Sequence, residues 1–181
     1  MPPDRLLFIR HAEEHDTAGF TESGHPDPHS LTVRGWQRAG ALARFLDPDA
    51  GSTLAPDFVF ASAIGPGSES RRPQQTVAPL VARMRERGHD AYSDAHAKPQ
   101  TAALVADALR RSGTVLVSWE HSRIAECIAA LPNPPPAPAK WPSDRYDLVW
   151  VLDRAGDGWT FREVAQRLLS GDRPAEAQDT R

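Results

Sequence analysis

The feature that most constrains the fold is a short apolar segment, Leu6 to Ile9, that ends abruptly at charged residues. A wholly apolar run of this length is typical of a strand that is buried on both faces of a sheet. Similar segments follow at residues 57–62 (DFVFAS) and 114–118 (TVLVS), and helical stretches separate them. This alternation predicts an α/β fold, a three-layer α/β/α sandwich with a mostly parallel central sheet.

Helical periodicity predicts four helices around these strands. Thr32 is suited to cap the first helix, and Pro73 fits the first turn of the second, where a missing N–H costs nothing. Near the end of the chain, a Gly-Asp-Gly turn at 156–158 separates two further strand patterns and predicts a hairpin. The helices are expected at residues 33–46, 72–88, 101–111 and from about 122, and the hairpin strands at 147–153 and 159–164.

Length and composition favour one domain. The chain has 181 residues, 40% of them hydrophobic, which is enough to bury a core, and one cysteine excludes an internal disulfide framework. We expect a single domain over residues 1–171 and a flexible tail over 172–181. A net charge of −3 excludes a general attraction to nucleic acid. No apolar segment is long enough for a signal peptide or a membrane span, so we expect a cytoplasmic protein with no membrane partner.

Charged residues follow the predicted strand ends. Arg10 and His11 come directly after the first strand, and His121 comes just after the third. Arg71 and Arg72 stand at the start of the helix after the second strand. Ligands of parallel sheets bind beyond the carboxyl ends of the strands. Guanidinium groups, imidazole N–H groups and helix N-termini all favour phosphate, so the pattern predicts a phosphate site at this edge.

In their order and context, these residues resemble the histidine phosphatase superfamily, also called phosphoglycerate mutase-like. The resemblance runs through most of residues 5–131, and it is the combination of four motifs in order that is specific. The motifs are Arg10-His11-Ala12-Glu13 for the usual Arg-His-Gly-Glu, Leu31-Thr32-x-x-Gly35-x-x-x-Ala39, Arg72-Pro73-Gln74-Gln75-Thr76 for the usual Arg-Ala-x-Gln-Thr, and His121 after a hydrophobic strand.

The resemblance implies a reaction that needs no metal and no organic cofactor. His11 would be the nucleophile and form a phosphohistidine, with its other ring nitrogen held by a backbone carbonyl. Arg10 and Arg72 would bind the phosphoryl oxygens. His121 would also bind the phosphoryl group and stabilise the transition state. We expect the partner to be a small phosphorylated metabolite, with a phosphoprotein as the alternative.

The proton donor departs from the family pattern. Glu120 stands where the family usually has glycine, and residues 90–104 (DAYSDAHAKPQTAAL), where relatives commonly carry the acid, contain no glutamate. A carboxyl group beside a phosphate dianion has a raised pKa, which suits a proton donor. Glu120 is therefore our first candidate as a catalytic residue, ahead of Asp94 and Glu13. Neighbouring strand residues point to opposite faces, so Glu120 facing away from the pocket is the competing possibility.

Several functions share this constellation. A phosphomonoesterase is favoured. The alternatives are a phosphoglycerate-mutase-type phosphotransferase, a protein phosphohistidine phosphatase and an inactive phosphate-binding module. A mutase needs a pocket closed to water, and a chain of this length offers little extra structure for a lid. The loop histidines His15, His25 and His29 suggest zinc, but no cysteine assists them and two intervening prolines prevent helical presentation. We therefore expect no metal.

Overall fold

The computed structural model describes residues 2–14 and 18–175. Within them, the strands are β1 (Arg5–Arg10), β2 (Phe58–Ala61), β3 (Tyr92–Ser93), β4 (Thr114–Trp119), β5 (Leu148–Ala155) and β6 (Gly158–Ala165). The helices are α1 (Val33–Phe45), α2 (Arg72–Glu86), α3 (Thr101–Ala108) and α4 (His121–Ala129), with a short 3₁₀ helix η1 (Pro48–Ala50). None of the described helices is long and apolar enough to cross a membrane.

The strands form one sheet in the order β3-β2-β4-β1-β5-β6. β1 pairs in parallel with β4, and β2 pairs in parallel with both β4 and β3. β5 runs antiparallel to β1 and to β6, and the strands β5 and β6 form the expected hairpin. The predicted fold class, α/β with a mostly parallel central sheet, is therefore confirmed. The two-residue strand β3 was not expected from the sequence.

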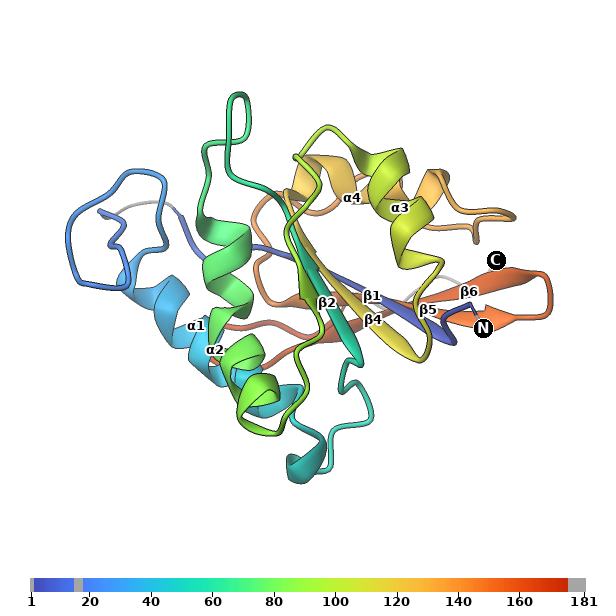
Figure 1. The fold of residues 1–181 in the computed structure, drawn as a ribbon, viewed down its shortest axis with the longest axis horizontal. Helices are drawn as coiled ribbons and strands as arrows, with labels where there is room; N and C mark the ends of the chain where they lie inside the picture. The colour runs from blue at the N-terminus through green and yellow to red at the C-terminus, as the bar shows by residue number, and fades with distance from the viewer. Residues whose placement is uncertain (1, 15–17, 176–181) are drawn as a thin grey trace.

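Helices cover both faces of the sheet, with α1 and α2 on one side and α3 and α4 on the other (Figure 1). Strand β1 lies between the two helical layers, and its successive side chains point alternately into two cores, one on each face of the sheet. Leu6 and Phe8 pack into the core beneath α3 and α4. Leu7 and Ile9 pack into the core beneath α1 and α2. Each of the four is at most 1% exposed, as an apolar central strand predicts.

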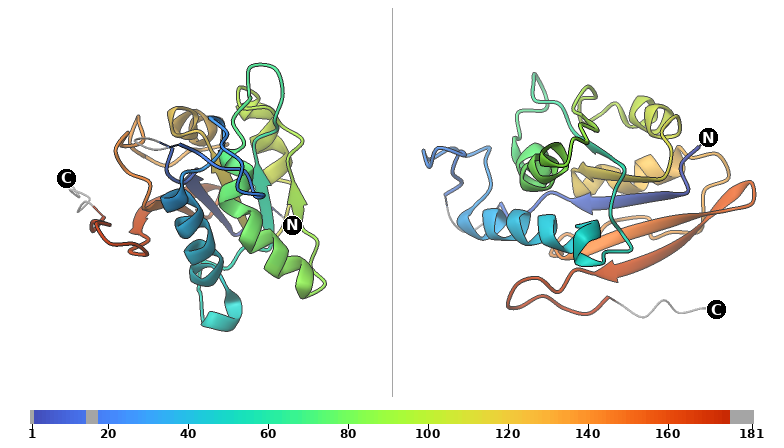
Figure 2. Two further views of the ribbon diagram at one scale, coloured as in Figure 1. Left: turned by 90° about the vertical axis from the view of Figure 1, so that its left-hand side faces the viewer. Right: turned by 60° about the horizontal axis from the view of Figure 1, so that its bottom comes forward.

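The segment after β6 folds back beneath the sheet (Figure 2). Within the stretch expected to be a flexible tail, Asp172 and Arg173 make specific contacts. The Asp172 carboxylate accepts hydrogen bonds from the Arg38 side chain and from the backbone N–H of Leu168. The backbone N–H of Arg173 donates to Asp147 at 2.8 Å. These two residues are therefore fastened to the domain, and residues 176–181 lie outside the described part of the chain.

The sheet register sets the position of the site. Arg10 is paired with Trp119 at the ends of β1 and β4, and the His11 N–H donates to the Trp119 carbonyl at 3.1 Å. On β4, the Ser118 hydroxyl donates to the Pro73 carbonyl in the first turn of α2 at 2.9 Å. The carboxyl ends of β1 and β4 and the start of α2 therefore meet at one edge. His121, the first residue of α4, follows β4 at this edge.

Candidate active site

The backbone after β1 is fastened to both helices of one face. The Ala12 N–H donates to the Thr76 hydroxyl on α2 at 2.8 Å. The Thr32 hydroxyl, which caps α1, donates to the Glu13 carbonyl at 3.1 Å. A Cβ atom on Gly35 would lie only 2.7 Å from that same carbonyl, so this close approach requires glycine. The motif residues of α1 and α2 thus fix the loop that carries His11.

His11 is 4% exposed, and its hydrogen bond defines the state of its ring. The Nδ1 atom lies 2.9 Å from the Ala12 carbonyl oxygen. Because a carbonyl can only accept, Nδ1 carries the proton and Nε2 keeps its lone pair. Burial lowers the pKa of His11 to about 4, although Glu14 and the Ala12 carbonyl act to raise it. The imidazole is therefore neutral at neutral pH, and Nε2 carries no proton.

Arg10 is 2% exposed, and the loop before β5 holds its guanidinium. Its Nη1 donates to the Ser143 carbonyl, and its Nη2 lies 3.0 Å from the Tyr146 hydroxyl. The guanidinium carbon also lies 3.8 Å from the centroid of the Tyr146 ring, in a cation–π contact. Nη2 donates to Glu14 Oε1 at 2.9 Å. Neither Tyr146 nor Ser143 was predicted from the sequence as a partner of Arg10.

Arg72 reaches the same place from the first turn of α2. Its Nη1 donates to Glu14 Oε2 at 2.8 Å. Its Nε donates to the Ser30 carbonyl at 3.2 Å, and its Nη2 donates to the Pro28 carbonyl at 2.5 Å. The guanidinium is thus oriented by backbone carbonyls of the loop before α1. Arg71, by contrast, has a half-exposed side chain beside Asp27, at 3.6 Å.

Glu14 is the residue on which these side chains converge. One carboxylate oxygen accepts from Arg10 and the other from Arg72, and Oε1 lies 3.9 Å from His11 Nε2. Burial acts to raise the pKa of Glu14, but protonation of His11 in acid and the positive charges of Arg72 and Arg10 hold it below its ordinary value. An anionic carboxylate therefore lies between two arginines and next to the lone pair of His11. We did not predict this role for Glu14, although it directly follows the first motif.

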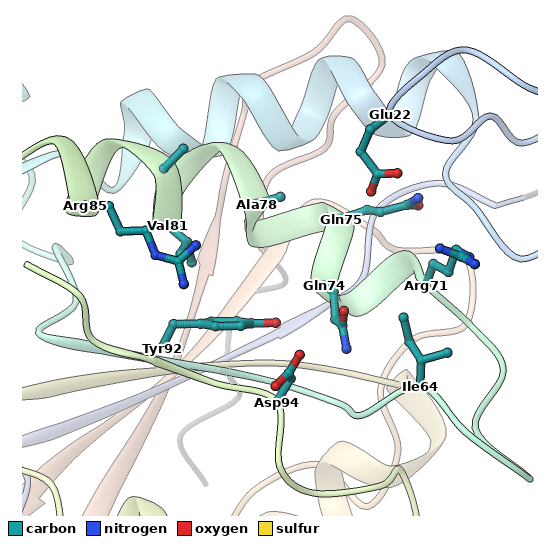
Figure 3. A pocket seen from close by; sticks show the side chains of 11 residues that line it. Glu22, Ile64, Arg71, Gln74, Gln75, Ala78, Val81, Arg85, Tyr92 and Asp94 are labelled. Carbon is teal, nitrogen blue, oxygen red and sulfur yellow. The ribbon is translucent and has the colours of Figure 1, made fainter.

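The carboxyl groups that we expected as proton donors have other partners. Glu13 accepts from Arg38 at 2.8 Å and pairs with Arg34 at 3.3 Å. Glu120 pairs with Lys98 at 3.1 Å. Asp94 lines a cavity of about 250 Å³ on the side of α2, together with Tyr92 and Gln74 (Figure 3). Among the described contacts of Arg10 and Arg72, Glu14 is the carboxylate partner.

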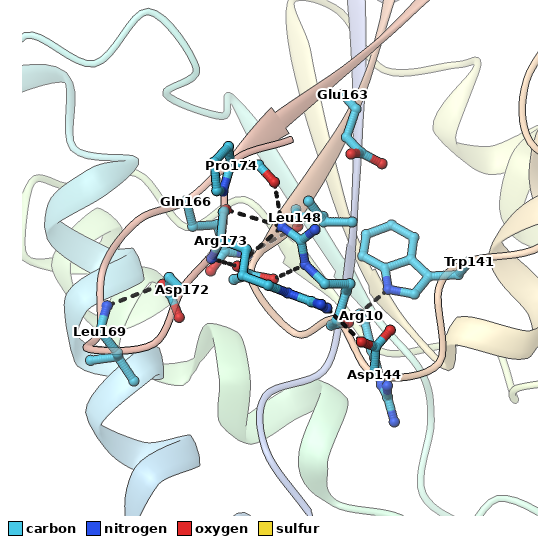
Figure 4. A network of polar contacts seen from close by, with 12 residues as sticks. Arg10, Trp141, Asp144, Leu148, Glu163, Gln166, Leu169, Asp172, Arg173 and Pro174 are labelled. Carbon is cyan, nitrogen blue, oxygen red and sulfur yellow. Dashed lines mark hydrogen bonds and ion pairs between the residues drawn. The ribbon is translucent and has the colours of Figure 1, made fainter. Parts of the chain in front are cut away.

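A buried polar network supports the loop that contacts Arg10 (Figure 4). Arg145 donates to Asp147 and to the carbonyls of Arg173 and Pro174. The Arg145 backbone carbonyl also accepts from the Trp141 indole at 2.9 Å. The C-terminal segment therefore holds the loop at residues 141–147, which in turn positions Arg10.

The histidine-rich loop forms no metal site in the described part of the chain. No group of at least three His, Cys, Asp or Glu residues there has a metal-binding arrangement. His25 Nδ1 lies 2.8 Å from the Ser23 hydroxyl, and His29 lies elsewhere in the same loop. His15 lies outside the described residues.

Comparisons with known proteins bear on the fold. No family model and no curated protein matches the sequence. The structure matches the "putative phosphohistidine phosphatase SixA" of Agrobacterium tumefaciens with a TM-score of 0.51 at 20% identity, covering 90% of this chain and 99% of that one. It also matches a "putative alpha-ribazole-5'-P phosphatase" of Escherichia coli with a TM-score of 0.50 at 17% identity, covering 92% and 98%.

The chain shares the fold of these two proteins, which are members of the histidine phosphatase superfamily. The resemblance that the four motifs indicated is thereby confirmed at the level of the fold. In this fold, Arg10 is the last residue of β1 and His11 follows it. Arg72 is the first residue of α2, and His121 begins α4 just after β4. At 20% identity or below, the likeness extends to the fold and not to the substrate.

Proposed function

We propose that this protein is a phosphatase that hydrolyses a phosphomonoester through a phosphohistidine intermediate on His11. The observation that carries this proposal is the Glu14 carboxylate, held by Arg10 and Arg72 at 3.9 Å from His11 Nε2. Carboxylate and phosphoryl oxygens use the same guanidinium donors. The two arginines therefore form an anion site directly beside a neutral, buried imidazole.

The chemistry follows from this arrangement. The Nε2 lone pair of His11 attacks phosphorus, and the hydrogen bond from Nδ1–H to the Ala12 carbonyl stabilises the charge that builds on the ring. Arg10 and Arg72 neutralise the phosphoryl oxygens. His121, at the N-terminus of α4, supplies a further donor to them in our proposal. Each such donor contributes about 3–4 kcal/mol of transition-state stabilisation. Water then attacks the phosphohistidine and releases phosphate.

The proposed substrate is a small phosphorylated metabolite. A phosphohistidine-containing protein is the second candidate, because the Agrobacterium neighbour is named for that activity. Release of inorganic phosphate from small esters supports the first, and release from a phosphohistidine peptide alone supports the second. A mutase would return an isomerised ester without free phosphate.

The test of this function is His11→Ala assayed on p-nitrophenyl phosphate, with rapid-quench mass spectrometry for the mass of one phosphoryl group on the protein. We expect the wild type to turn over and to trap a phosphohistidine, and the variant to do neither. His89→Ala is the matched control, because His89 is exposed and its ring contacts the carbonyl of Asp57. Asp57 precedes β2, at the end of the sheet away from His11. Equal turnover by wild type and His11→Ala would overturn the proposal.

A further inference from the structure

We propose that Glu14 exchanges places with the phosphoryl group of the substrate and then donates the proton to the leaving group. This inference rests on the proposed phosphatase function and deepens it. It assigns the proton donor to a residue that the family motifs do not indicate, in place of Glu120.

Glu14 and a phosphoryl group at His11 would bind the same N–H groups of Arg10 and Arg72, and this is the reason for the exchange. Glu14 accepts from Arg10 Nη2 at 2.9 Å and from Arg72 Nη1 at 2.8 Å. A phosphoryl group in contact with His11 needs these same N–H groups, and it carries the same sign of charge as the carboxylate. Two anions cannot share one pair of guanidinium groups at such distances without strong repulsion. Binding of the phosphoryl group therefore displaces the carboxylate to the flank of the anion site.

Displacement changes the chemistry of the carboxyl group. In the free protein, Arg10 and Arg72 favour its charged form. Once the phosphoryl oxygens have taken these partners, Glu14 faces a dianion instead, and a neighbouring like charge favours the protonated form. Among the described residues, His11, which is neutral, and Tyr146, whose hydroxyl contacts Arg10, also interact with this carboxyl group. The carboxyl group then carries a proton beside the scissile bond.

The proton balance closes without another reactant. A monoanionic ester enters with one proton on its phosphoryl group, and that proton passes to Glu14 as the dianion takes the arginines. His11 Nε2 then forms a bond to phosphorus, the bond to the leaving oxygen breaks, and Glu14 gives its proton to that oxygen. In the second step the Glu14 carboxylate takes a proton from water, whose oxygen attacks phosphorus. The P–N bond breaks and restores neutral His11.

Two of the other acidic candidates, Glu13 and Glu120, are held by ion pairs. Glu13 is engaged by Arg38, a buried residue whose second carboxylate partner is Asp172. Glu120 pairs with Lys98, whose backbone carbonyl accepts from the Trp119 indole. For either of them to reach the leaving group, an observed ion pair would have to break without a phosphoryl group taking over its cationic partner. Glu14 loses its partners to the substrate itself.

Two measurements on Glu14→Gln test the two halves of the proposal. The first is the affinity for inorganic phosphate by calorimetry, which we expect to increase about tenfold because the internal competitor loses its charge. The second compares kcat/KM for benzyl phosphate, whose leaving group needs a proton, with kcat/KM for p-nitrophenyl phosphate, whose leaving group does not. This ratio reports formation of the phosphohistidine and not the later attack by water, which both esters share. We expect the variant to lose about 100-fold more on benzyl phosphate.

Each alternative gives a different result. Unchanged or weaker phosphate binding in Glu14→Gln overturns the exchange. Equal changes in kcat/KM on both esters overturn proton donation, and a selective loss on benzyl phosphate in Glu120→Gln transfers the role to Glu120. Glu126→Gln is the matched control, since Glu126 is half-exposed on α4 and pairs with Arg123. If wild type turns over neither ester, the proposed function fails, while the phosphate affinities still decide the exchange.

Discussion

At the scale of single residues, burial decides the protonation state of His11. Its ordinary pKa is 6.5, and burial lowers it to about 4 against the opposing effect of Glu14. We therefore expect the His11 imidazole of the free protein to gain its second proton only as the pH falls through about 4. The measurement is an NMR titration of histidine ring protons, with the His11 signal assigned by its absence in His11→Ala.

The variant Glu14→Gln provides a control for this titration. Because the Glu14 carboxylate raises the pKa of His11, Glu14→Gln should move the His11 transition to still lower pH. A His11 transition near pH 6.5 in folded protein would contradict the lowering of the His11 pKa by burial.

A substitution of Arg72 tests whether activity depends on the geometry of its guanidinium group or only on its charge. Its three donor atoms contact Glu14, Ser30 and Pro28, an arrangement that an ammonium group cannot reproduce. We expect Arg72→Lys to lower kcat/KM on p-nitrophenyl phosphate about 100-fold, close to the loss of one oxyanion donor. Arg71→Lys, at the half-exposed neighbour, should stay within about twofold. Full activity of Arg72→Lys would show that a positive charge is enough at this position and that guanidinium geometry is not needed.

At the scale of elements, the cap of α1 links helix stability to the site. The Thr32 hydroxyl accepts from the Gly35 N–H at 3.1 Å and donates to the Glu13 carbonyl. Removing it in Thr32→Ala should lower the free energy of unfolding by about 1 kcal/mol, measured by urea denaturation. Thr32→Ser keeps the hydroxyl and should retain most of the stability. An equal loss in both variants would assign the effect to the buried methyl group.

Elements with local signals could be predicted from the sequence, and those that depend on distant partners could not. The helix α1 has its own cap and periodicity, and β1 has its own apolar run. By contrast, the two residues of β3 are a strand only because they pair with β2. The site divides in the same way. His11 and Arg72 follow from motifs, whereas the Glu14–Arg72 contact spans 58 residues and the Arg10–Tyr146 contact spans 136.

At the scale of the whole molecule, the C-terminal segment is joined to the loop that carries His11 through Arg38. The Arg38 guanidinium bonds to Asp172 at 2.7 Å on one side and to Glu13 at 2.8 Å on the other. Glu13 belongs to the loop that carries His11, so this network connects the two ends of the described chain. Asp172 is nearly buried, with a side chain that is 4% exposed, so its contacts are poorly screened by water.

We expect Asp172→Asn to weaken this connection in a pH-dependent way. Burial acts to raise the pKa of Asp172, but Arg38 and two backbone N–H groups lower it from 3.8 to about 2. A depressed pKa in the folded state stabilises the protein above the unfolded value, and this stabilisation is lost as the pH falls from about 4 toward 2. At pH 7 the free energy of unfolding of the variant should be about 2 kcal/mol lower than that of the wild type, and this difference should shrink as the pH falls from about 4 toward 2.

Urea denaturation of both proteins at several pH values measures this difference. Asp144→Asn is the matched control, because Asp144 is exposed and pairs with Arg173 at the surface, where screening makes such pairs weak. If the destabilisation by Asp172→Asn were the same at pH 3 and pH 7, the segment would be held by packing rather than by its charge. If instead the difference follows the titration of Asp172, the same acid range should also loosen Glu13 and the loop of His11, because Arg38 joins the two carboxylates.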